Sequence, residues 1–183
     1  MKQHLSDKEI LSLCKESESQ SYGFNLLVRK YQERLYFHIR KMVVLHDDAD
    51  DVLQQTFIKA WKNITLFRGD SQVYTWLYRI ASNASIDFLK DKKKRTYTSI
   101  DEVPNYYLNA IEDDPLFTGD EMEKVFHKAL LLLPDKQRLV FNLKYFDELK
   151  YEEISEITGT SVGGLKASYH HAVEKIKFFI ENN

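Results

Sequence analysis

Apolar residues recur every three to four positions along most of this chain, which is the spacing of one face of an α-helix. Alternation of apolar and polar residues, the pattern of a half-buried strand, is nearly absent. Six helices are predicted from the spacing alone, over about residues 6–16, 21–45, 49–64, 72–92, 121–133 and 134–146. The pattern therefore predicts an all-α fold.

Local signals indicate where several of these helices begin. Ser6 followed three residues later by Glu9 is a capping box. The run from His46 to Asp48 predicts a break and a cap ahead of the third helix. Pro134 suits the first position of a helix, where its missing N–H is not needed. These boundaries depend only on neighbouring residues.

Residues 151–172 predict two short helices joined by a tight turn. Gly159 suits a helix end in the left-handed conformation, and Ser161 is a good N-cap for the next helix. Val162 and Leu165 would lie on the inner face of that second helix. This is the helix-turn-helix arrangement, whose second helix can enter a major groove of DNA. Similar helix pairs also occur in bundles that touch no DNA.

The composition fits one medium or two small packed domains. The 183 residues are 43% hydrophobic and 13% aromatic, and no apolar run is long enough to span a membrane. The N-terminus lacks the apolar core of a secretion signal. The single cysteine, Cys14, excludes an internal disulfide and a cysteine zinc cage, and its helical surroundings predict a small, semi-buried core residue. We expect a cytoplasmic protein with no membrane insertion.

The net charge of −2 is unevenly distributed. From residue 96 to residue 123 there are eight acidic residues and no Lys or Arg. Taking these eight from the 28 acidic residues leaves 20 against 26 basic ones, a balance of +6. The same stretch lacks a sustained apolar stripe, which is typical of a linker. The predicted organisation is a helical domain (1–95), an acidic linker (96–119) and a smaller helical domain (120–183).

The helix predicted over residues 49–64 has two distinct faces. Leu53, Phe57 and Trp61 repeat every four residues, so we expect them to face the core. The other face combines acidic and amide groups with an apolar residue, and it is either a solvated surface or a docking face for a protein. The candidate protein-binding residues are Asp50, Asp51, Gln54, Gln55 and Ile58.

Residues 68–83 interleave arginines with aromatic side chains beside a glycine-bearing loop. This combination suits stacking on unpaired bases and holding phosphates, although Trp76, Leu77 and Ile80 are also well suited to a core. A basic run at 90–95 follows and would contact a nucleic-acid backbone. The candidate DNA-binding residues here are Arg68, Ser71, Tyr74, Arg79, Asn83 and Lys90.

The final helix offers a second candidate DNA-binding set. Residues near its start would meet base edges, and flanking residues would meet phosphates. The set consists of Ser161, Gly164, Lys166, Ser168, Tyr169, His170 and Lys175. The adjacent His170 and His171 are a weak metal candidate, because neighbours on a helix point about 100° apart and no third ligand is close in sequence.

No set of catalytic residues is apparent in the sequence. There is no Gly-rich phosphate loop and no HExxH motif, and the pair Asp113 and Asp114 falls in the predicted linker. We therefore expect a binding protein rather than a hydrolase or nuclease, with no cofactor, no metal and no small-molecule substrate.

Three stretches, in order, resemble the extracytoplasmic function (ECF, group 4) sigma factors of bacterial RNA polymerase. Residues 48–61 are similar to region 2.2 of that family, and residues 67–87 are similar to regions 2.3 and 2.4. Residues 133–138 and the helix-turn-helix are similar to region 4. The amino-acid sequence of residues 165–172 resembles that of the Bacteroidetes branch of the family. The resemblance covers nearly the whole chain and implies a sigma2-like bundle joined to a sigma4-like helix-turn-helix domain.

The resemblance also implies partners and a mechanism. The region 2.2 face would bind the core polymerase through its β′ subunit, with β as a further contact. Residues 68–83 would capture an unpaired base about 10 base pairs upstream of the start (the −10 element), a form of base extrusion. The last helix would read the major groove about 35 base pairs upstream (the −35 element). The linker would pass through the RNA-exit region of the polymerase. An anti-sigma factor would regulate the protein.

Two departures from the family pattern change these expectations. Many members carry Arg at the positions of Ser168 and His171, so this chain should prefer a different upstream sequence and bind phosphates there less strongly. Position 55 is more often Glu than Gln, so Gln55 keeps hydrogen bonding but loses charge. The alternative hypothesis is a stand-alone helix-turn-helix regulator that binds palindromic duplex DNA. In that scheme the arginine–aromatic loop and the acidic linker have no role.

Overall fold

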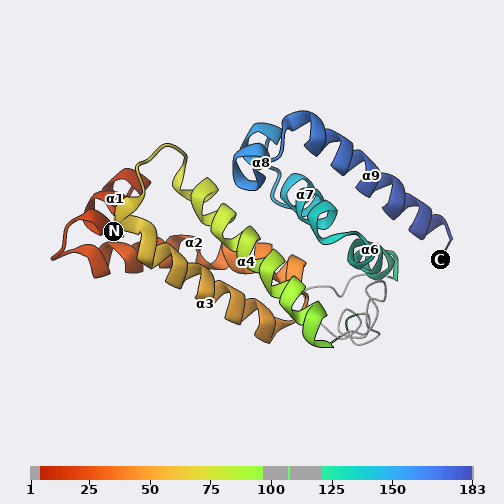
Figure 1. Ribbon diagram of the computed structural model, residues 1–183, viewed down its shortest axis with the longest axis horizontal. Coiled ribbons are helices and arrows are strands. Elements are labelled where there is room, and N and C mark those ends of the chain that lie inside the picture. The colour runs from red at the N-terminus through yellow and green to blue at the C-terminus, as the bar shows by residue number, and fades with distance from the viewer. Residues whose placement is uncertain (1–4, 97–106, 108–120, 183) are drawn as a thin grey trace.

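The computed structural model describes residues 5–96, 107 and 121–182, and every regular element in these ranges is helical (Figure 1). The elements are α1 (Asp7–Lys15), α2 (Gln20–Val43), α3 (His46–Asn63), the 3₁₀ turn η1 (Ile64–Leu66), α4 (Val73–Thr96), α6 (Glu121–Leu131), α7 (Asp135–Tyr145), α8 (Tyr151–Thr158) and α9 (Val162–Glu181). The all-α prediction is confirmed. None of the helices in these ranges is both long and apolar enough to cross a membrane.

The first four helices form a bundle around a continuous apolar core. Helices α2, α3 and α4 pack side by side, and α1 lies against α2 (Figure 1). Leu27 and Leu35 of α2 and Leu77 of α4 are fully buried in this core. Cys14 of α1 is also fully buried, which confirms the core role expected for it.

The capping box that opens α1 is confirmed, because the Ser6 side chain accepts from the Glu9 N–H and the Glu9 carboxylate accepts from the Ser6 N–H. The break predicted at His46 to Asp48 is wrong by two residues. Those residues form the first turn of α3. The negative charges of Asp47 and Asp48 stabilise the helix there, because they lie at the positive end of its dipole. The break itself is a γ-turn centred on Val44, with φ 72° and the Leu45 N–H bonded to the Val43 carbonyl.

The prediction that Leu53, Phe57 and Trp61 face the core is confirmed in part, because Leu53 and Phe57 are half-buried against the core and Trp61 is exposed. The buried residues of α3 are the smaller ones one position earlier, Ala49, Val52, Thr56 and Ala60. Trp61 is 38% exposed, and its ring meets Phe24 edge-on at 5.0 Å between centroids. Small side chains therefore form the centre of the face that packs on α2 and α4, and the aromatic rings of Phe57 and Trp61 lie at its margin.

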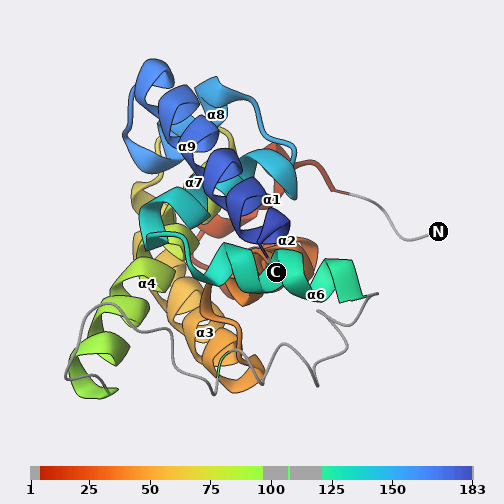
Figure 2. The ribbon, with the colours of Figure 1, turned by 90° about the vertical axis from the view of Figure 1, so that its right-hand side faces the viewer.

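The second domain contains α6 to α9 and has an apolar cluster of its own around Phe141, Ala172 and Ile176. Figure 2 shows α9 running alongside α7 toward α6. Pro134 is the N-cap of α7 rather than its first helical residue, so the predicted position is wrong by one. The acidic linker predicted at 96–119 lies outside the described residues apart from the end of α4 and Tyr107, whose ring is 5.3 Å from the Lys92 ammonium.

The helix-turn-helix is confirmed in its local geometry. Gly159 has φ 70°, and its N–H bonds the Ser155 carbonyl at 2.8 Å, which closes α8 in the left-handed conformation that glycine adopts without strain. The Ser161 hydroxyl then accepts from the Gly164 N–H at 3.3 Å and starts α9. Leu165 is fully buried, as the pattern predicted.

The two domains share one core. Leu139 and Leu143 of α7, Ile154 of α8 and Leu165 of α9 belong to the same buried cluster as the residues of the first bundle. Helix α8 packs on α4, and α7 packs on α2 and α4 (Figure 1). The helix-turn-helix domain therefore lies against the helix predicted to read the −10 element.

Candidate nucleic-acid interface

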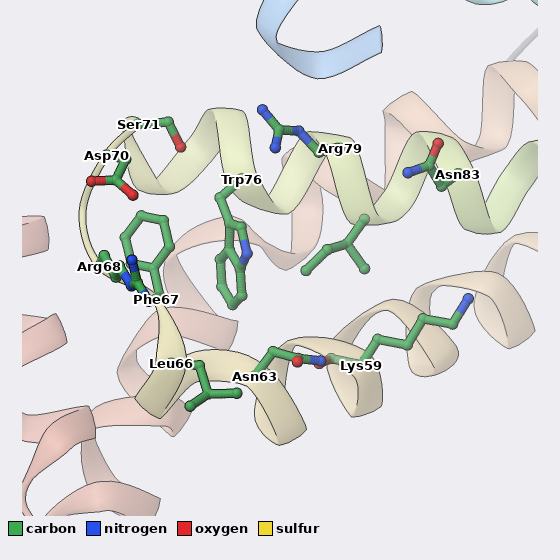
Figure 3. A pocket seen from close by; sticks show the side chains of 11 residues that line it. Lys59, Asn63, Leu66, Phe67, Arg68, Asp70, Ser71, Trp76, Arg79 and Asn83 are labelled. Carbon is green, nitrogen blue, oxygen red and sulfur yellow. The ribbon is translucent and has the colours of Figure 1, made fainter. Parts of the chain in front are cut away.

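An open pocket of about 600 Å³ lies where the end of α3 meets the loop before α4 (Figure 3). Its lining residues come from α3, that loop and the first half of α4: Lys59, Asn63, Leu66, Phe67, Arg68, Asp70, Ser71, Trp76, Arg79, Ile80 and Asn83. Four of the six residues predicted to bind the −10 element are in this set, namely Arg68, Ser71, Arg79 and Asn83. The pocket thus gathers most of that candidate site.

Aromatic rings form one wall of the pocket. The centroids of Phe67 and Trp76 are 4.9 Å apart, with an angle of 35° between the rings (Figure 3). Phe67 is nearly buried, whereas Leu66 on the rim is 72% exposed. Gly69, with φ 84°, turns the loop between them and α4. A planar apolar wall beside exposed hydrogen-bonding groups suits a flat, polar-edged molecule such as an unpaired base.

Polar and charged groups surround this wall. Lys59 and Asn63 lie on α3, and the Asn63 amide donates to the Lys59 carbonyl at 2.8 Å. Asp70 and Ser71 lie on the loop, and Asn83 lies on α4 toward the end of the pocket nearer Lys59 (Figure 3). The pocket can therefore offer both amide and carboxylate partners to a base edge.

The sequence reasoning missed part of this site. Lys59, Asn63 and Leu66 were not among the candidates, because they lie on the helix before the loop. Phe67 lies one residue before the predicted segment 68–83, and Trp76 was expected to suit the core. A spacing of four residues between Lys59 and Asn63, directly before an arginine–aromatic loop, was the signal that could have included the end of α3.

Tyr74 and Lys90 lie outside the pocket. The Tyr74 hydroxyl donates to the Glu153 carboxylate of α8, and burial first, then this bond, raises the pKa of Tyr74. The same bond lowers the pKa of Glu153. Lys90 is exposed two turns beyond Asn83, with its ammonium 3.9 Å from Asp87. Tyr74 is thus held by the second domain in this structure.

Arg79 lies on the pocket margin, and its guanidinium is also held by α8. Its Nε and Nη2 donate to the Glu156 carbonyl at 3.0 and 2.5 Å. Figure 3 shows the side chain directed away from Phe67 and Trp76, toward a blue ribbon above. Two residues predicted to meet DNA therefore bind the helix-turn-helix domain instead.

The candidate protein-binding face of α3 is fully exposed. All five predicted residues, Asp50, Asp51, Gln54, Gln55 and Ile58, are solvent-accessible on one side of the helix. Ile58 is 48% exposed and adds an apolar side chain to this polar face. This geometry agrees with a docking face and leaves its partner unassigned.

The candidate set on α9 divides into exposed and packed members. Gly164, Lys166, His170 and Lys175 are exposed, and Ser161 is exposed but uses its hydroxyl as the N-cap. Tyr169 is half-buried and stacks on Phe141 at 5.4 Å, so its ring belongs to the core and burial raises its pKa. Ser168 is also half-buried. The surface left for DNA is the exposed group near the start of α9.

Comparison with known families assigns a family to each half of the chain. Residues 27–95 match the family Sigma-70 region 2, and residues 124–176 match Sigma-70, region 4. The ECF RNA polymerase sigma-E factors of Salmonella typhimurium and Escherichia coli K12 are each 32% identical over 184 residues, covering 96% of this chain and 95% of theirs. This chain belongs to the ECF sigma factors. As a sigma factor, it directs RNA polymerase to specific promoters.

Two solved structures support the ECF sigma fold. CnrH in complex with the cytosolic domain of CnrY has a TM-score of 0.70 at 20% identity and covers 97% of this chain and 98% of its own. The sigma factor RpoE in complex with the anti-sigma factor NepR from Bartonella quintana has a TM-score of 0.67 at 20% identity. This match covers 86% of this chain and 96% of the RpoE chain. The pocket lies in the region 2 match, and α8 and α9 begin in the region 4 match.

Proposed function

We propose that this ECF sigma factor uses the pocket between α3 and α4 to hold an unpaired base of the −10 element. The observation that carries this proposal is the Phe67–Trp76 wall with hydrogen-bonding groups around it, in the part of the chain that matches region 2. Extruding a base costs a few kcal/mol. Stacking of about 1–3 kcal/mol per base, with hydrogen bonds to the base edge, offsets that cost.

Different residues around the pocket would bind the phosphates and the base edge of the strand. Arg68 would pair with a phosphate beside the extruded base, and Arg79 would do so once it is released from the Glu156 carbonyl. Lys90 would continue the cationic path along α4. Asn83 and Ser71 offer donors and acceptors to the base edge. Tyr74 joins this surface when α8 is absent from it.

The second reader is the start of α9. Its exposed Lys166 and His170 would face base edges in the major groove of the −35 element, and Lys175 would approach the backbone. Because Ser168 and His171 stand where the family resemblance implies arginine, this helix would make few phosphate contacts, and its binding to DNA would depend on the polymerase. The alternative of a stand-alone regulator lacks a structural observation in its favour.

The exposed face of α3 is proposed to dock on the core polymerase, through β′ with β as neighbour. The solved relatives CnrH and RpoE are bound to CnrY and to the anti-sigma factor NepR, and we infer that an anti-sigma factor also controls this chain. The protein would work in the cytoplasm as a binding subunit without catalysis of its own.

The pocket is tested by replacing one polar group on its wall. Asn83→Ala should lower transcription from a mapped promoter by roughly tenfold to a hundredfold, the range of one lost base contact. Gln72→Ala, an exposed residue beside the pocket but outside its lining, is the matched control. The readout is in vitro transcription with the host core polymerase.

A template already melted at the −10 element separates base capture from other defects. Transcription by Asn83→Ala should recover partly on this template, since the extrusion cost has been removed. Wild-type activity of Asn83→Ala on intact duplex would contradict the pocket assignment. Failure of the chain to bind core polymerase at all would contradict the proposed role as a whole.

A further inference from the structure

We propose that Leu66 is an apolar wedge, which enters the base stack of the promoter duplex and fills the place that the extruded base leaves. The proposal rests on the pocket function above and names the residue that would open the stack before the base is captured. Its observations are the exposure of Leu66, its fixed position on the pocket rim and the cations around it.

Leu66 is the most exposed large apolar side chain in the described part of the chain. Its exposed fraction is 72%, whereas Ile64 is fully buried and Phe67 is 8% exposed on the same short stretch. Leu66 belongs to neither of the two apolar cores. Its apolar surface is therefore not used in folding, and covering it with a partner would release free energy.

The backbone holds Leu66 in a fixed place. Leu66 is the last residue of η1, the turn that follows α3 without a break and packs on α1. Ile64 anchors this turn in the core, and the Phe67 N–H closes it on the Ile64 carbonyl at 3.2 Å. A wedge must keep its position while bases part around it. A side chain on an anchored turn loses little backbone freedom when it does so.

Leu66 lies on the rim of the pocket at the end of α3. Figure 3 shows Leu66 on the turn after α3, with Trp76 projecting from α4 toward α3. An extruded base rotates about its own backbone, so the gap in the stack lies just outside the pocket that receives the base. A residue on the rim can enter that gap. Leucine is among the side chains that insert between base steps and unstack them.

The charges around Leu66 indicate a nucleic acid as the partner that covers it. Residues 59–68 include Lys59, Lys62 and Arg68 and no acidic residue. All three cations are exposed, and none of them makes an ion pair with another residue that the structure describes. An apolar side chain among such cations suits a partner that is apolar inside and negatively charged outside. A base stack between its two phosphate backbones has this character.

The test measures transcription from a mapped promoter by holoenzymes that carry substitutions at this turn. Leu66→Ala should lower transcription from intact duplex about tenfold, because the gap in the stack stays unfilled. Leu66→Gln, which is of similar length but polar, should lose as much. Leu66→Met keeps an apolar side chain of similar volume and should stay near the wild type. Thr65→Ala, at an exposed neighbour outside the pocket lining, is the matched control.

Two further measurements separate the wedge from the pocket. Binding of the holoenzyme to a single-stranded −10 oligonucleotide requires no opening of a duplex, and neither does transcription from a template already melted at the −10 element. Leu66→Ala should match the wild type in both measurements. Asn83→Ala should bind the oligonucleotide more weakly, because it lacks a contact to the captured base.

Three results would overturn the wedge. The first is wild-type transcription by Leu66→Ala from intact duplex. The second is an equal loss on the melted template, which would make Leu66 part of the pocket wall. The third is weaker binding of Leu66→Ala to core polymerase, which would make Leu66 a protein contact. Failure of the pocket function would appear in Asn83→Ala instead, so the two failures are distinguishable.

Discussion

At the scale of single residues, Gly23 decides how closely α1 approaches α2. A Cβ atom at Gly23 would lie 2.7 Å from the Leu13 Cβ and 2.8 Å from the Cys14 backbone nitrogen. The neighbours include backbone atoms, which cannot rotate away. Gly163 in α9 is the opposite case, with open space around the corresponding position. Helical periodicity places both glycines in helices and cannot distinguish them.

Gly23→Ala should lower the free energy of unfolding by about 1–3 kcal/mol, because overpacking forces α1 away from α2. Gly163→Ala should raise it by roughly 0.5–1 kcal/mol, because alanine is the better helix former in open space. Urea unfolding of the two variants and the wild type measures both values. Equal effects of the two substitutions would contradict the close contact at Gly23.

At the scale of elements, the helix-turn-helix depends on two local devices that the sequence displays directly. Gly159 ends α8 in the left-handed conformation, and Ser161 caps α9. The same Ser161 was predicted to approach DNA, so its hydroxyl has two candidate roles. Two substitutions separate these roles, because aspartate caps a helix as well as serine but carries a negative charge.

Ser161→Ala should lower the free energy of unfolding by about 1 kcal/mol through loss of the cap. Ser161→Asp should keep stability near that of the wild type, yet weaken binding to −35 duplex DNA by repelling phosphates. Thermal unfolding and a duplex-binding titration with the polymerase holoenzyme are the two measurements. Undiminished DNA binding by Ser161→Asp would place Ser161 away from the DNA backbone.

At the scale of the whole molecule, a stack of three side chains joins the domains. The Phe146 ring lies 4.5 Å from the Lys41 ammonium of α2 and 6.2 Å from the parallel His127 ring of α6. Burial, and then the nearby charge of Lys41, lower the pKa of His127 below its ordinary value of 6.5. The folded chain thus binds a proton at His127 less readily than the unfolded chain does.

This shift gives the stability a defined pH dependence. The contribution of neutral His127 is fully present above pH 6.5, and it is lost as the pH falls from 6.5 through the lower folded pKa. His127→Gln should therefore flatten the fall in unfolding free energy on the acid side of pH 6.5. Denaturant titrations of both proteins at several pH values measure the difference. Parallel curves would contradict the lowered pKa.

Much of the candidate site was predictable from the sequence, because it comes from one continuous segment. Arg68, Ser71 and Asn83 lie within 16 residues of each other, and a loop leading into a helix brings them together. Lys59 and Asn63 were missed because their place on the pocket depends on how α3 lies against α4. The margin position of Trp61 was missed for the same reason.

The sequence by itself determined the all-α class, the helix-turn-helix and the arginine–aromatic loop, because periodicity, caps and turn residues act between near neighbours in the chain. Only the tertiary structure decided that Tyr74 bonds Glu153, 79 positions later, and that Arg79 bonds the backbone of Glu156. Such contacts depend on the packing of whole helices, which many distant apolar residues set together. The contact between α8 and α4 therefore became visible only in the folded chain.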